Sequence, residues 1–353
     1  MPILRMQPRR QMRDTARMRP IFQPRLVNGP FGDPALFVDV LFERRALLFD
    51  LGDIAAVPPR KLLRTSHVFV SHTHMDHFVG FDRLLRICLG RDRPLALYGP
   101  ERFIGQVEHK LAAFTWNLVE NYAIDLELTA HEVTANGTLR RASFNSRERF
   151  ARRDLPPLAL DHGRLLVEPA FEVRCAVLDH QTPCLAFAVQ EAVHVNVWRN
   201  RLADLGVEPG PWLREAKHAI LAGAADDTVV MARAPGGVAE RSVSLGMLRR
   251  QALRVVPGQK FAYVTDVANH AGNVQRIVEL AEAADLLFIE CTFLDADAAD
   301  ATRKCHLTAR QAGAIAAAAG VSVLVPFHFS PRYAGREAEL RAEAQAAFGG
   351  PVA

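Results

Sequence analysis

The sequence has few cysteines, and they are not arranged in pairs. Five cysteines occur in 353 residues, and no Cys-x-x-Cys motif brings two of them together. They are Cys88, Cys175, Cys184, Cys291 and Cys305. An odd number of widely spaced cysteines argues against a disulfide framework and indicates free thiols in a reducing compartment. We therefore expect a cytoplasmic protein.

The sequence also lacks a strong charge imbalance and a long apolar run. The 43 Lys and Arg residues against 39 Asp and Glu residues give a formal net charge of +4, which is too small to indicate a polyanionic partner by itself. The one long apolar stretch, residues 312–327, contains Ser322 and Pro326 and is shorter than the roughly 20 residues that a membrane span requires. We expect no membrane partner, and a nucleic acid would have to be bound by local clusters of basic residues.

A signal peptide is not expected at the N-terminus. The first twenty residues contain six arginines and one acid, Asp14, but no continuous apolar core. We interpret residues 1–20 as a basic, disordered tail; a nucleic-acid arm and residues added by an upstream start codon are the alternatives. The hydrophobic content of 49% suffices for a buried core, and residues 21–353 are interpreted as a single domain.

One short segment is dense in potential metal ligands. Residues 68–77 read Val-Phe-Val-Ser-His-Thr-His-Met-Asp-His, an apolar strand followed by His72, His74, Asp76 and His77. Beyond the strand, the alternation of side chains lets His72 and His74 point the same way. Imidazole nitrogen and carboxylate oxygen suit a first-row divalent ion, and two neighbouring ions would each need ligands from elsewhere in the chain.

Three further candidates have a similar setting. His180 follows the apolar residues 171–178, Asp266 follows 261–265, and His328 follows 321–327. Taken singly, each of them is more often a structural polar residue than a ligand. Strand ends are where sites of open α/β proteins are built, so the joint placement of all three predicts one metal centre.

This order of ligands resembles the metallo-β-lactamase superfamily, and the segment from His328 to Tyr333 is similar to ribonuclease Z. Four other segments are similar to that family: Tyr98-Gly-Pro100, Glu290-Cys-Thr-Phe293, His306-Leu-Thr308 and Gly206-Val-Glu-Pro-Gly-Pro211. The resemblance implies a layered α/β fold, the αββα sandwich, with an inserted arm. It also implies an endoribonuclease that removes the 3′ trailer from precursor tRNA and acts as a homodimer, in which one subunit's arm holds the RNA that the other cuts.

We expect seven protein ligands for two ions, with Asp266 bridging them. The first ion is assigned to His72, His74 and His180, and the second to Asp76, His77 and His328. The resemblance implies two Zn²⁺ ions, and Mn²⁺ or Fe²⁺ are the alternatives. Such ions lower the pKa of a bound water from 15.7 to about 7 and so supply hydroxide at neutral pH. Asp76 is a catalytic candidate as well, because it could orient this water.

Further residues are candidates for proton transfer and substrate binding. His306 stands just before an expected helix and is the candidate general acid, while Glu290 would hold its imidazole in the donating tautomer. Arg332 either contacts a substrate phosphate or pairs with a nearby acid. Substrate contacts are also assigned to Tyr333 and to the turn formed by Pro209, Gly210 and Pro211.

Apolar strands alternate with helical stretches in both halves of the chain. The pattern predicts a hairpin at 36–49, helices at 78–89, 273–283 and 309–319, and strands at 285–289 and 321–325. Thr308 with Gln311 fits a capping box at the start of one helix, and Gly320 fits its end.

Two segments interrupt this alternation. Residues 131–165 are polar and basic, and we interpret them as a solvated insertion loop, with a surface that binds phosphates and stacks on bases as the alternative. Residues 195–258 contain the Pro-Gly-Pro turn and several basic residues, and the resemblance implies that an RNA-gripping arm lies here.

Two other functions remain open. A small-molecule metallo-hydrolase on the same scaffold would act on a cyclic nucleotide, a lactone or another ester. An RNA-binding protein that has lost catalysis is disfavoured, because every expected ligand and the expected acid are present.

Overall fold

The chain divides into two compact units in the computed structural model, which describes residues 21–41, 43–237 and 239–353. Residues 22–193 and 257–353 form the larger one, the sandwich unit, and residues 194–256 form the arm unit. The tail predicted at 1–20 lies outside the described residues. The arm predicted at about 195–258 coincides with the arm unit, and the single domain predicted over 21–353 stays a prediction.

The first sheet of the sandwich unit has eight strands in sequence order. They are β1 (Phe22–Leu26), β2 (Leu36–Val40), β3 (Arg45–Phe49), β4 (Thr65–Phe69), β5 (Leu95–Gly99), β6 (Glu127–Val133), β7 (Thr138–Asn145) and β8 (Arg152–Ala159). Strands β3 to β6 pair in parallel, and antiparallel pairs extend the sheet on both sides. The carboxyl ends of β3 and β4 therefore lie at one edge.

The second sheet has six strands in the order β18-β17-β16-β11-β10-β9. They are β9 (Arg164–Val167), β10 (Phe171–Asp179), β11 (Pro183–Glu191), β16 (Lys260–Val264), β17 (Leu286–Glu290) and β18 (Val323–Phe327). Strands β16, β17 and β18 pair in parallel, and the other pairs are antiparallel. Asp266, Glu290 and His328 accordingly lie at or just beyond the carboxyl ends of three adjacent strands.

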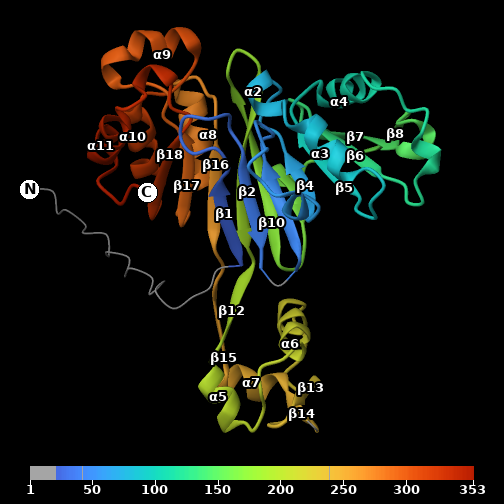
Figure 1. The fold of residues 1–353 in the computed structure, drawn as a ribbon. Coiled ribbons are helices and arrows are strands. Elements are labelled where there is room, and N and C mark those ends of the chain that lie inside the picture. Colours follow the sequence, from blue (N-terminus) through green and yellow to red (C-terminus); the bar gives the residue numbers. More distant parts are fainter. Residues whose placement is uncertain (1–20, 42, 238) are drawn as a thin grey trace, which may run out of the picture. The chain divides into compact units, whose positions relative to one another are not determined.

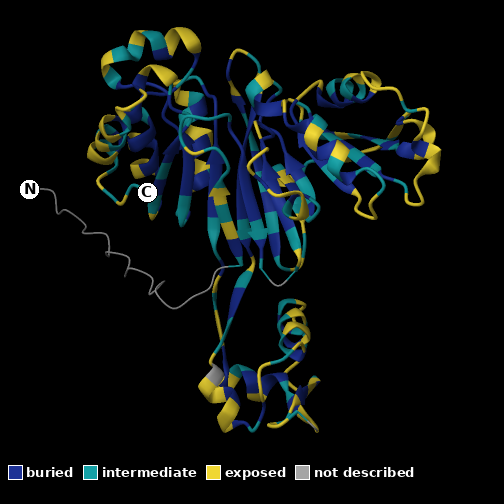
Figure 2. Cartoon of the chain, viewed as in Figure 1, coloured by how far each residue is buried: buried dark blue, intermediate teal, exposed yellow. Residues whose placement is uncertain are grey.

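Aromatic side chains fill the space between the two sheets. The Phe49 ring of the first sheet lies 5.7 Å from that of Phe187 and 5.7 Å from that of Phe261 in the second, and the ring of Phe69 also contacts Phe187 at 5.6 Å. Buried residues run along the strands of both sheets (Figure 2). The whole of Phe261–Val264 is buried, because β16 is covered by a sheet on one face and helices on the other.

Helices cover the outer faces of the sheets (Figure 1). Those following the strands of the first sheet are α1 (Pro59–Leu62), α2 (Met75–Phe78), α3 (Phe81–Cys88) and α4 (Phe103–Ala112); those of the second are α8 (Ala271–Ala281), α9 (Ala298–Lys304), α10 (Ala309–Ala319) and α11 (Glu337–Phe348). Two apolar clusters join helices to sheets, one containing Leu84 and Leu97, the other Ile315 and Leu287. The predicted αββα sandwich is confirmed. No helix among the described residues has the length and apolarity needed to cross a membrane.

The C-terminal elements follow the predicted pattern closely. Helix α10 spans the predicted residues and begins with the capping box, in which Thr308 accepts from the backbone of Gln311. Gly320 ends the helix with a positive φ of 62°, a backbone conformation that favours glycine. This capped helix follows His306 directly and so fixes the backbone beside the site.

The segment 131–165 is not the predicted insertion loop. Its residues complete β6 and form β7 and β8, which pair antiparallel at the edge of the first sheet. Several of its arginines make ion pairs on this surface, such as Arg153 with Glu148 at 2.7 Å. The apolar residues Ala142 and Phe144 of β7 are buried against the helices, whereas β8 has no buried residue, so this edge is that of a half-exposed sheet.

The arm unit contains short elements. They are β12 (Val193–Val197), α5 (Arg199–Asp204), α6 (Trp212–Leu221), β13 (Val229–Arg233), β14 (Glu240–Ser244), α7 (Leu245–Gln251) and β15 (Leu253–Pro257). Strands β12 and β15 form one two-stranded sheet, and β13 and β14 form another. Its core includes Trp212, Ile220 and Leu248.

Candidate metal centre

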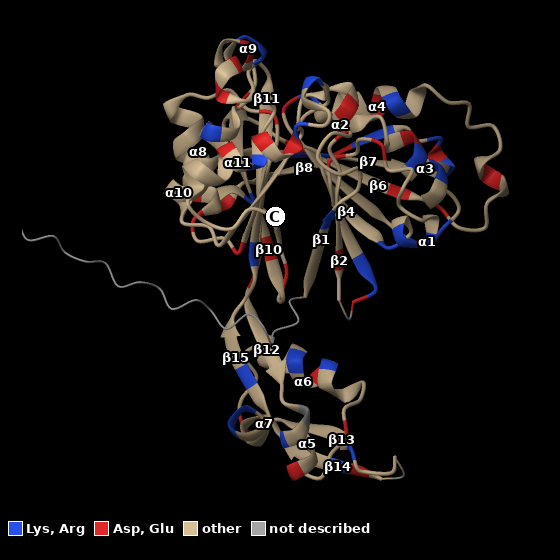
Figure 3. Ribbon diagram, turned by 60° about the vertical axis from the view of Figure 1, so that its left-hand side comes forward, with Lys and Arg blue, Asp and Glu red and all other residues tan. Residues whose placement is uncertain are grey.

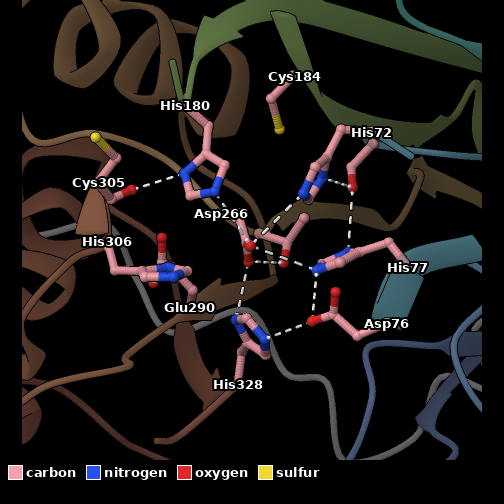
Figure 4. A network of polar contacts seen from close by, with 12 residues as sticks. His72, Asp76, His77, His180, Cys184, Asp266, Glu290, Cys305, His306 and His328 are labelled. Carbon is pink, nitrogen blue, oxygen red and sulfur yellow. Dashed lines mark hydrogen bonds and ion pairs between the residues drawn. The ribbon is translucent and has the colours of Figure 1, made fainter. Parts of the chain in front are cut away.

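The predicted ligands meet at the carboxyl ends of the strands of the sandwich unit. His72 and His74 follow β4, and Asp76 and His77 lie in α2, which begins immediately after His74. The other three follow strands of the second sheet: His180 follows β10, Asp266 lies beyond β16, and His328 follows β18. Figure 4 shows the labelled side chains converging from the two sheets; they are His72, Asp76, His77, His180, Asp266 and His328.

Asp266 lies at the centre of this cluster. Its Oδ2 atom is 3.6 Å from His72 Nε2, 3.5 Å from His180 Nε2 and 3.5 Å from His77 Nε2. Its Oδ1 atom is 2.9 Å from His328 Nδ1. One carboxylate thus faces histidines from both predicted ligand sets, which is the placement expected of a bridging ligand.

Three overlapping groups of side chains have the spacing of metal ligands, and one of them, Asp266, His306 and His328, includes the predicted acid. In the group of His72, His74, His180 and Asp266, the potential ligand atoms lie within 4.8 Å of one another. Asp76, His77 and His328 form the second such group. The Asp76 Oδ2 atom is 3.4 Å from His77 Nε2 and 3.5 Å from His328 Nε2. The structure therefore brings together all seven residues that the sequence assigned to metal binding.

The hydrogen bonds of the imidazoles fit a metal ion. The Nδ1 atoms of His72, His77 and His180 face Ser71 Oγ at 3.1 Å, Asp50 Oδ2 at 2.9 Å and the Cys305 carbonyl oxygen at 2.8 Å, respectively. The buried Nε2 atoms of His72 and His77 make no hydrogen bond. A buried imidazole nitrogen without a partner is costly, and a divalent cation would satisfy these atoms.

The charges of the cluster are strongly coupled. Burial lowers the pKa of His77, but the carboxylates of Asp266 and Asp50 outweigh this effect and raise its pKa well above the usual value. Burial, assisted by the neighbouring His77, lowers the pKa of His72 to about 2. Burial raises the pKa of Asp266, but His328 and His77 outweigh it and hold that pKa well below its usual range. His72 and Asp266 therefore have the protonation states that metal binding requires.

A second pair of side chains lies beside the cluster. The Nδ1 atom of His306 is 3.0 Å from Glu290 Oε2, and Glu290 is fully buried. Glu290 also accepts hydrogen bonds from the Val267 backbone N–H at 2.7 Å and from Thr292 Oγ1 at 2.6 Å. Burial lowers the pKa of His306, but the charge of Glu290 outweighs this effect and raises it. The predicted acid and its predicted partner are therefore in contact.

Comparison with known proteins shows relatives over nearly the whole chain. The family model described as "Beta-lactamase superfamily domain" matches residues 213–329. The ribonuclease Z of Deinococcus radiodurans is 33% identical over 335 residues, which are 91% of this chain and 93% of that protein. The chain belongs to the ribonuclease Z family. The predicted resemblance is thus confirmed, and the protein is a metal-dependent hydrolase.

Solved structures show the same fold at low identity. The metallo-β-lactamase fold protein YhfI from Bacillus subtilis has a TM-score of 0.51 and 18% identity, over 93% of this chain and 93% of its own. The human short form of tRNase Z has a TM-score of 0.50 and 21% identity, over 88% of this chain and 91% of its own. The chain therefore has the metallo-β-lactamase fold.

Sequence reasoning missed Asp50, which lies on the buried side of the site and contacts Ser71, His77 and Tyr263 there. Its carboxylate accepts hydrogen bonds from the Ser71 backbone at 2.6 Å, Ser71 Oγ at 2.9 Å and Tyr263 Oη at 3.0 Å, and it faces His77 Nδ1. Asp50 is fully buried and has a positive φ of 57°. A signal was present, because Asp50 directly follows the apolar strand β3, which pairs in parallel with β4.

An open pocket of about 500 Å³ leads to the predicted ligands. Asp76, Asp266, His306 and Lys304 are among the residues that line it. The lining residues do not include Tyr333, which was predicted to bind substrate, or Arg332, for which a phosphate contact was one of two alternatives.

The contacts of Arg332 and Tyr333 explain this difference. Arg332 lies 2.8 Å from Asp300 and stacks over the Phe293 ring at 5.1 Å. Tyr333 is buried, and its hydroxyl donates to Asp297. The structure favours the alternative in which Arg332 pairs with an acid, and the substrate contact predicted for Tyr333 stays a prediction.

The turn at residues 209–211 lies in the arm unit. Pro211 precedes α6, and the indole N–H of Trp212 donates to the Glu208 carbonyl at 2.9 Å. The substrate contact assigned to Pro209, Gly210 and Pro211 stays a prediction.

Proposed function

We propose that this protein is an endoribonuclease that removes the 3′ trailer from precursor tRNA, using two zinc ions. The observation that carries the proposal is the convergence of seven ligand side chains and the His306–Glu290 pair in a chain that shares 33% identity with a ribonuclease Z over 91% of its length. Because the donors are imidazoles and carboxylates without thiolate, Mn²⁺ and Fe²⁺ are the alternative ions. All five cysteines are buried and free, which suits a cytoplasmic enzyme.

The site residues have separate tasks in this proposal. Bound ions would supply a nucleophile at neutral pH and neutralise charge on the phosphoryl oxygens. Asp266 holds the two ligand groups together, and Asp76 is placed to orient the attacking group. When the bond between phosphorus and the 3′ oxygen breaks, that oxygen takes a proton from His306, whose Nδ1–H donates to Glu290 and so leaves the other nitrogen to carry the transferred proton.

The arm unit has the composition of an RNA-binding surface. Residues 194–256 contain nine Lys and Arg residues against six Asp and Glu residues. Basic residues occur on α5, α6 and α7 and on the strands β13, β14 and β15 (Figure 3). Such residues attract phosphates without reading sequence. We propose that the arm binds tRNA and that the enzyme is a homodimer in which one subunit's arm holds the RNA cut by its partner.

The first test compares two substrates with one preparation of known metal content. A precursor tRNA with a 3′ trailer and the small ester bis-p-nitrophenyl phosphate are incubated with the purified protein. Cleavage at the end of the acceptor stem is expected. Hydrolysis of the ester alone would refute tRNA processing and indicate a small-molecule hydrolase, whereas loss of both activities in the metal-loaded protein would refute catalysis.

Sedimentation tests the dimer separately. The active species is expected to sediment as a dimer at the concentrations used in the assay. A monomer that retains full activity on precursor tRNA would refute the cross-subunit grip without affecting the proposed chemistry.

A further inference from the structure

The pocket above the metal centre contains one lysine and no arginine among its described lining residues. Three acids line it, Asp33, Asp76 and Asp266, and Lys304 is the only lysine or arginine among the lining residues. A phosphodiester chain carries a negative charge at every link, so the phosphates beside the scissile one must lie near these acids. Bound ions can neutralise the central phosphate, but a neighbouring phosphate needs a separate cation.

Lys304 is available for this purpose. It is exposed, and no carboxylate of the described residues lies within ion-pair distance of its amino group. Its neighbour Arg303 instead pairs with Asp300 at 2.6 Å. The Lys304 amino group lies over the Phe293 ring, 5.7 Å from the ring centre, and Phe293 lines the same pocket. This weak contact leaves the ammonium hydrogens free to donate.

The backbone around Lys304 is fixed by the site itself. Cys305 has a positive φ of 59°, which ends α9, and its carbonyl accepts the hydrogen bond from His180 Nδ1. His306 follows and is held by Glu290. Residues 304–306 thus form one short segment. It carries the Lys304 cation, the Cys305 carbonyl that contacts the ligand His180, and the proposed acid His306. This segment positions Lys304 relative to the reacting phosphate.

Arg332 does not compete for this role, because its guanidinium is paired with Asp300 at 2.8 Å and stacked on Phe293. We propose that Lys304 binds a phosphate of the RNA next to the scissile phosphate and thereby favours polynucleotides over small esters. The inference rests on the proposed function for its substrate class, and it names the residue that recognises the chain beside the cut.

The test measures binding of a second phosphate separately from the reaction. Hydrolysis of bis-p-nitrophenyl phosphate is followed in the presence of a short oligouridylate, and the inhibition constant Ki of the oligouridylate is determined. For Lys304→Ala, Ki should rise about fivefold more than the KM for the ester, because the ester offers no neighbouring phosphate. The slope of log Ki against log salt concentration should fall by about 0.7, as expected for one lost contact to a single strand.

Two variants serve as controls. Arg303→Ala removes a cation from the same helical turn, where it has the same relation to the helix dipole. Because Arg303 does not line the pocket, this variant should leave Ki unchanged. Lys304→Arg keeps the charge and should keep Ki within about twofold of the wild-type value. Equal rises of Ki and KM in Lys304→Ala, an unchanged Ki, or a wild-type enzyme that oligouridylate does not inhibit would each overturn the proposal.

This experiment fails independently of the tRNA assignment. A wild-type enzyme that hydrolyses the ester and is inhibited by oligouridylate through Lys304, but leaves precursor tRNA intact, would overturn the proposed function and retain the phosphate contact. If wild type and Lys304→Ala trim precursor tRNA with equal efficiency and have the same Ki, the phosphate contact is overturned. The proposed function is then retained.

Discussion

The sandwich unit and the arm unit solve different physical problems. In the sandwich unit, each proposed ligand follows a strand or begins a helix, and the innermost of them, such as His72 and His77, are 1% and 0% exposed. In the arm unit, short helices and two-stranded sheets surround a small core and carry exposed basic residues. Metal chemistry needs atoms held within a fraction of an ångström, whereas binding of a phosphate backbone needs charge spread over a surface.

The largest expected effect comes from removing the central carboxylate of the sandwich unit. Asp266→Ala takes away the group that faces four histidines and should lower kcat/KM on the order of 10³-fold or more for both RNA and the small ester. Elemental analysis should show a loss of bound metal. Asp154→Ala, which removes an exposed carboxylate of β8, is the control and should change neither quantity. Normal metal content in Asp266→Ala would contradict the bridging role.

His306→Ala distinguishes proton transfer from metal binding within the same unit. Because the 3′ oxygen is a poor leaving group, kcat for RNA should fall about 10²- to 10⁴-fold while metal content stays near normal. The kcat for bis-p-nitrophenyl phosphate should fall far less, since p-nitrophenolate is a good leaving group that needs no proton. Measured kcat values for both substrates, with metal content, give the answer. An equal loss on both substrates together with metal loss would identify His306 as a ligand instead.

Removal of the arm unit tests the comparison directly. The backbone N–H of Trp198 donates to the Ala252 carbonyl at 2.9 Å, so residues 199–251 can be replaced by a short Gly-Ser linker. The shortened enzyme should lose on the order of 10²-fold in kcat/KM for precursor tRNA through the loss of basic contacts, and it should still hydrolyse the small ester. If both activities are lost while the metal content is normal, the arm is not a separable binding unit.

Asp50→Asn is expected to have a smaller effect, confined to the sandwich unit. The amide keeps the volume but loses the charge that faces His77, so metal affinity should weaken about 10- to 100-fold. Competition with a chelator measures this change, and activity at saturating metal should largely return. Ser146→Ala is a control that removes a buried hydrogen-bond acceptor elsewhere, a hydroxyl that accepts from the Leu126 N–H. Unchanged metal affinity in Asp50→Asn would show that the charge of Asp50 is not needed. The Ser71 and Tyr263 hydroxyls would then suffice to hold the buried side of the metal centre in place.

The sequence was most informative where local chemistry is dense. The run from His72 to His77 predicts ligands, because few other functions need four such side chains in six residues. Helix α10 was also predictable, since its capping box and terminal glycine are local signals. Asp50 escaped because a single carboxylate after an apolar strand is common, and only the pairing of β3 with β4 shows that it faces Ser71.

Polar strands and side-chain pairing were harder to predict. Residues 131–165 looked like a loop because arginines occupy the exposed positions of β7 and β8, where they pair with acids, and this masks the alternation of a sheet edge. Arg332 illustrates a second limit: its choice between a phosphate and Asp300 depends on α9, which lies some thirty positions earlier in the chain, as the ion pair shows. Contacts of this kind follow from tertiary packing and leave no local pattern.

The hydrogen bond from His180 to the Cys305 carbonyl links the first ligand group to the loop that carries Lys304 and His306. Any ion that fixes the His180 ring also fixes this carbonyl and, through it, the backbone of the proposed acid. Metal uptake and loop ordering are then thermodynamically linked, so each raises the equilibrium constant of the other. Amide hydrogen exchange at Cys305 and His306 should accordingly slow on metal addition, and the measured metal affinity includes the free energy of ordering this loop.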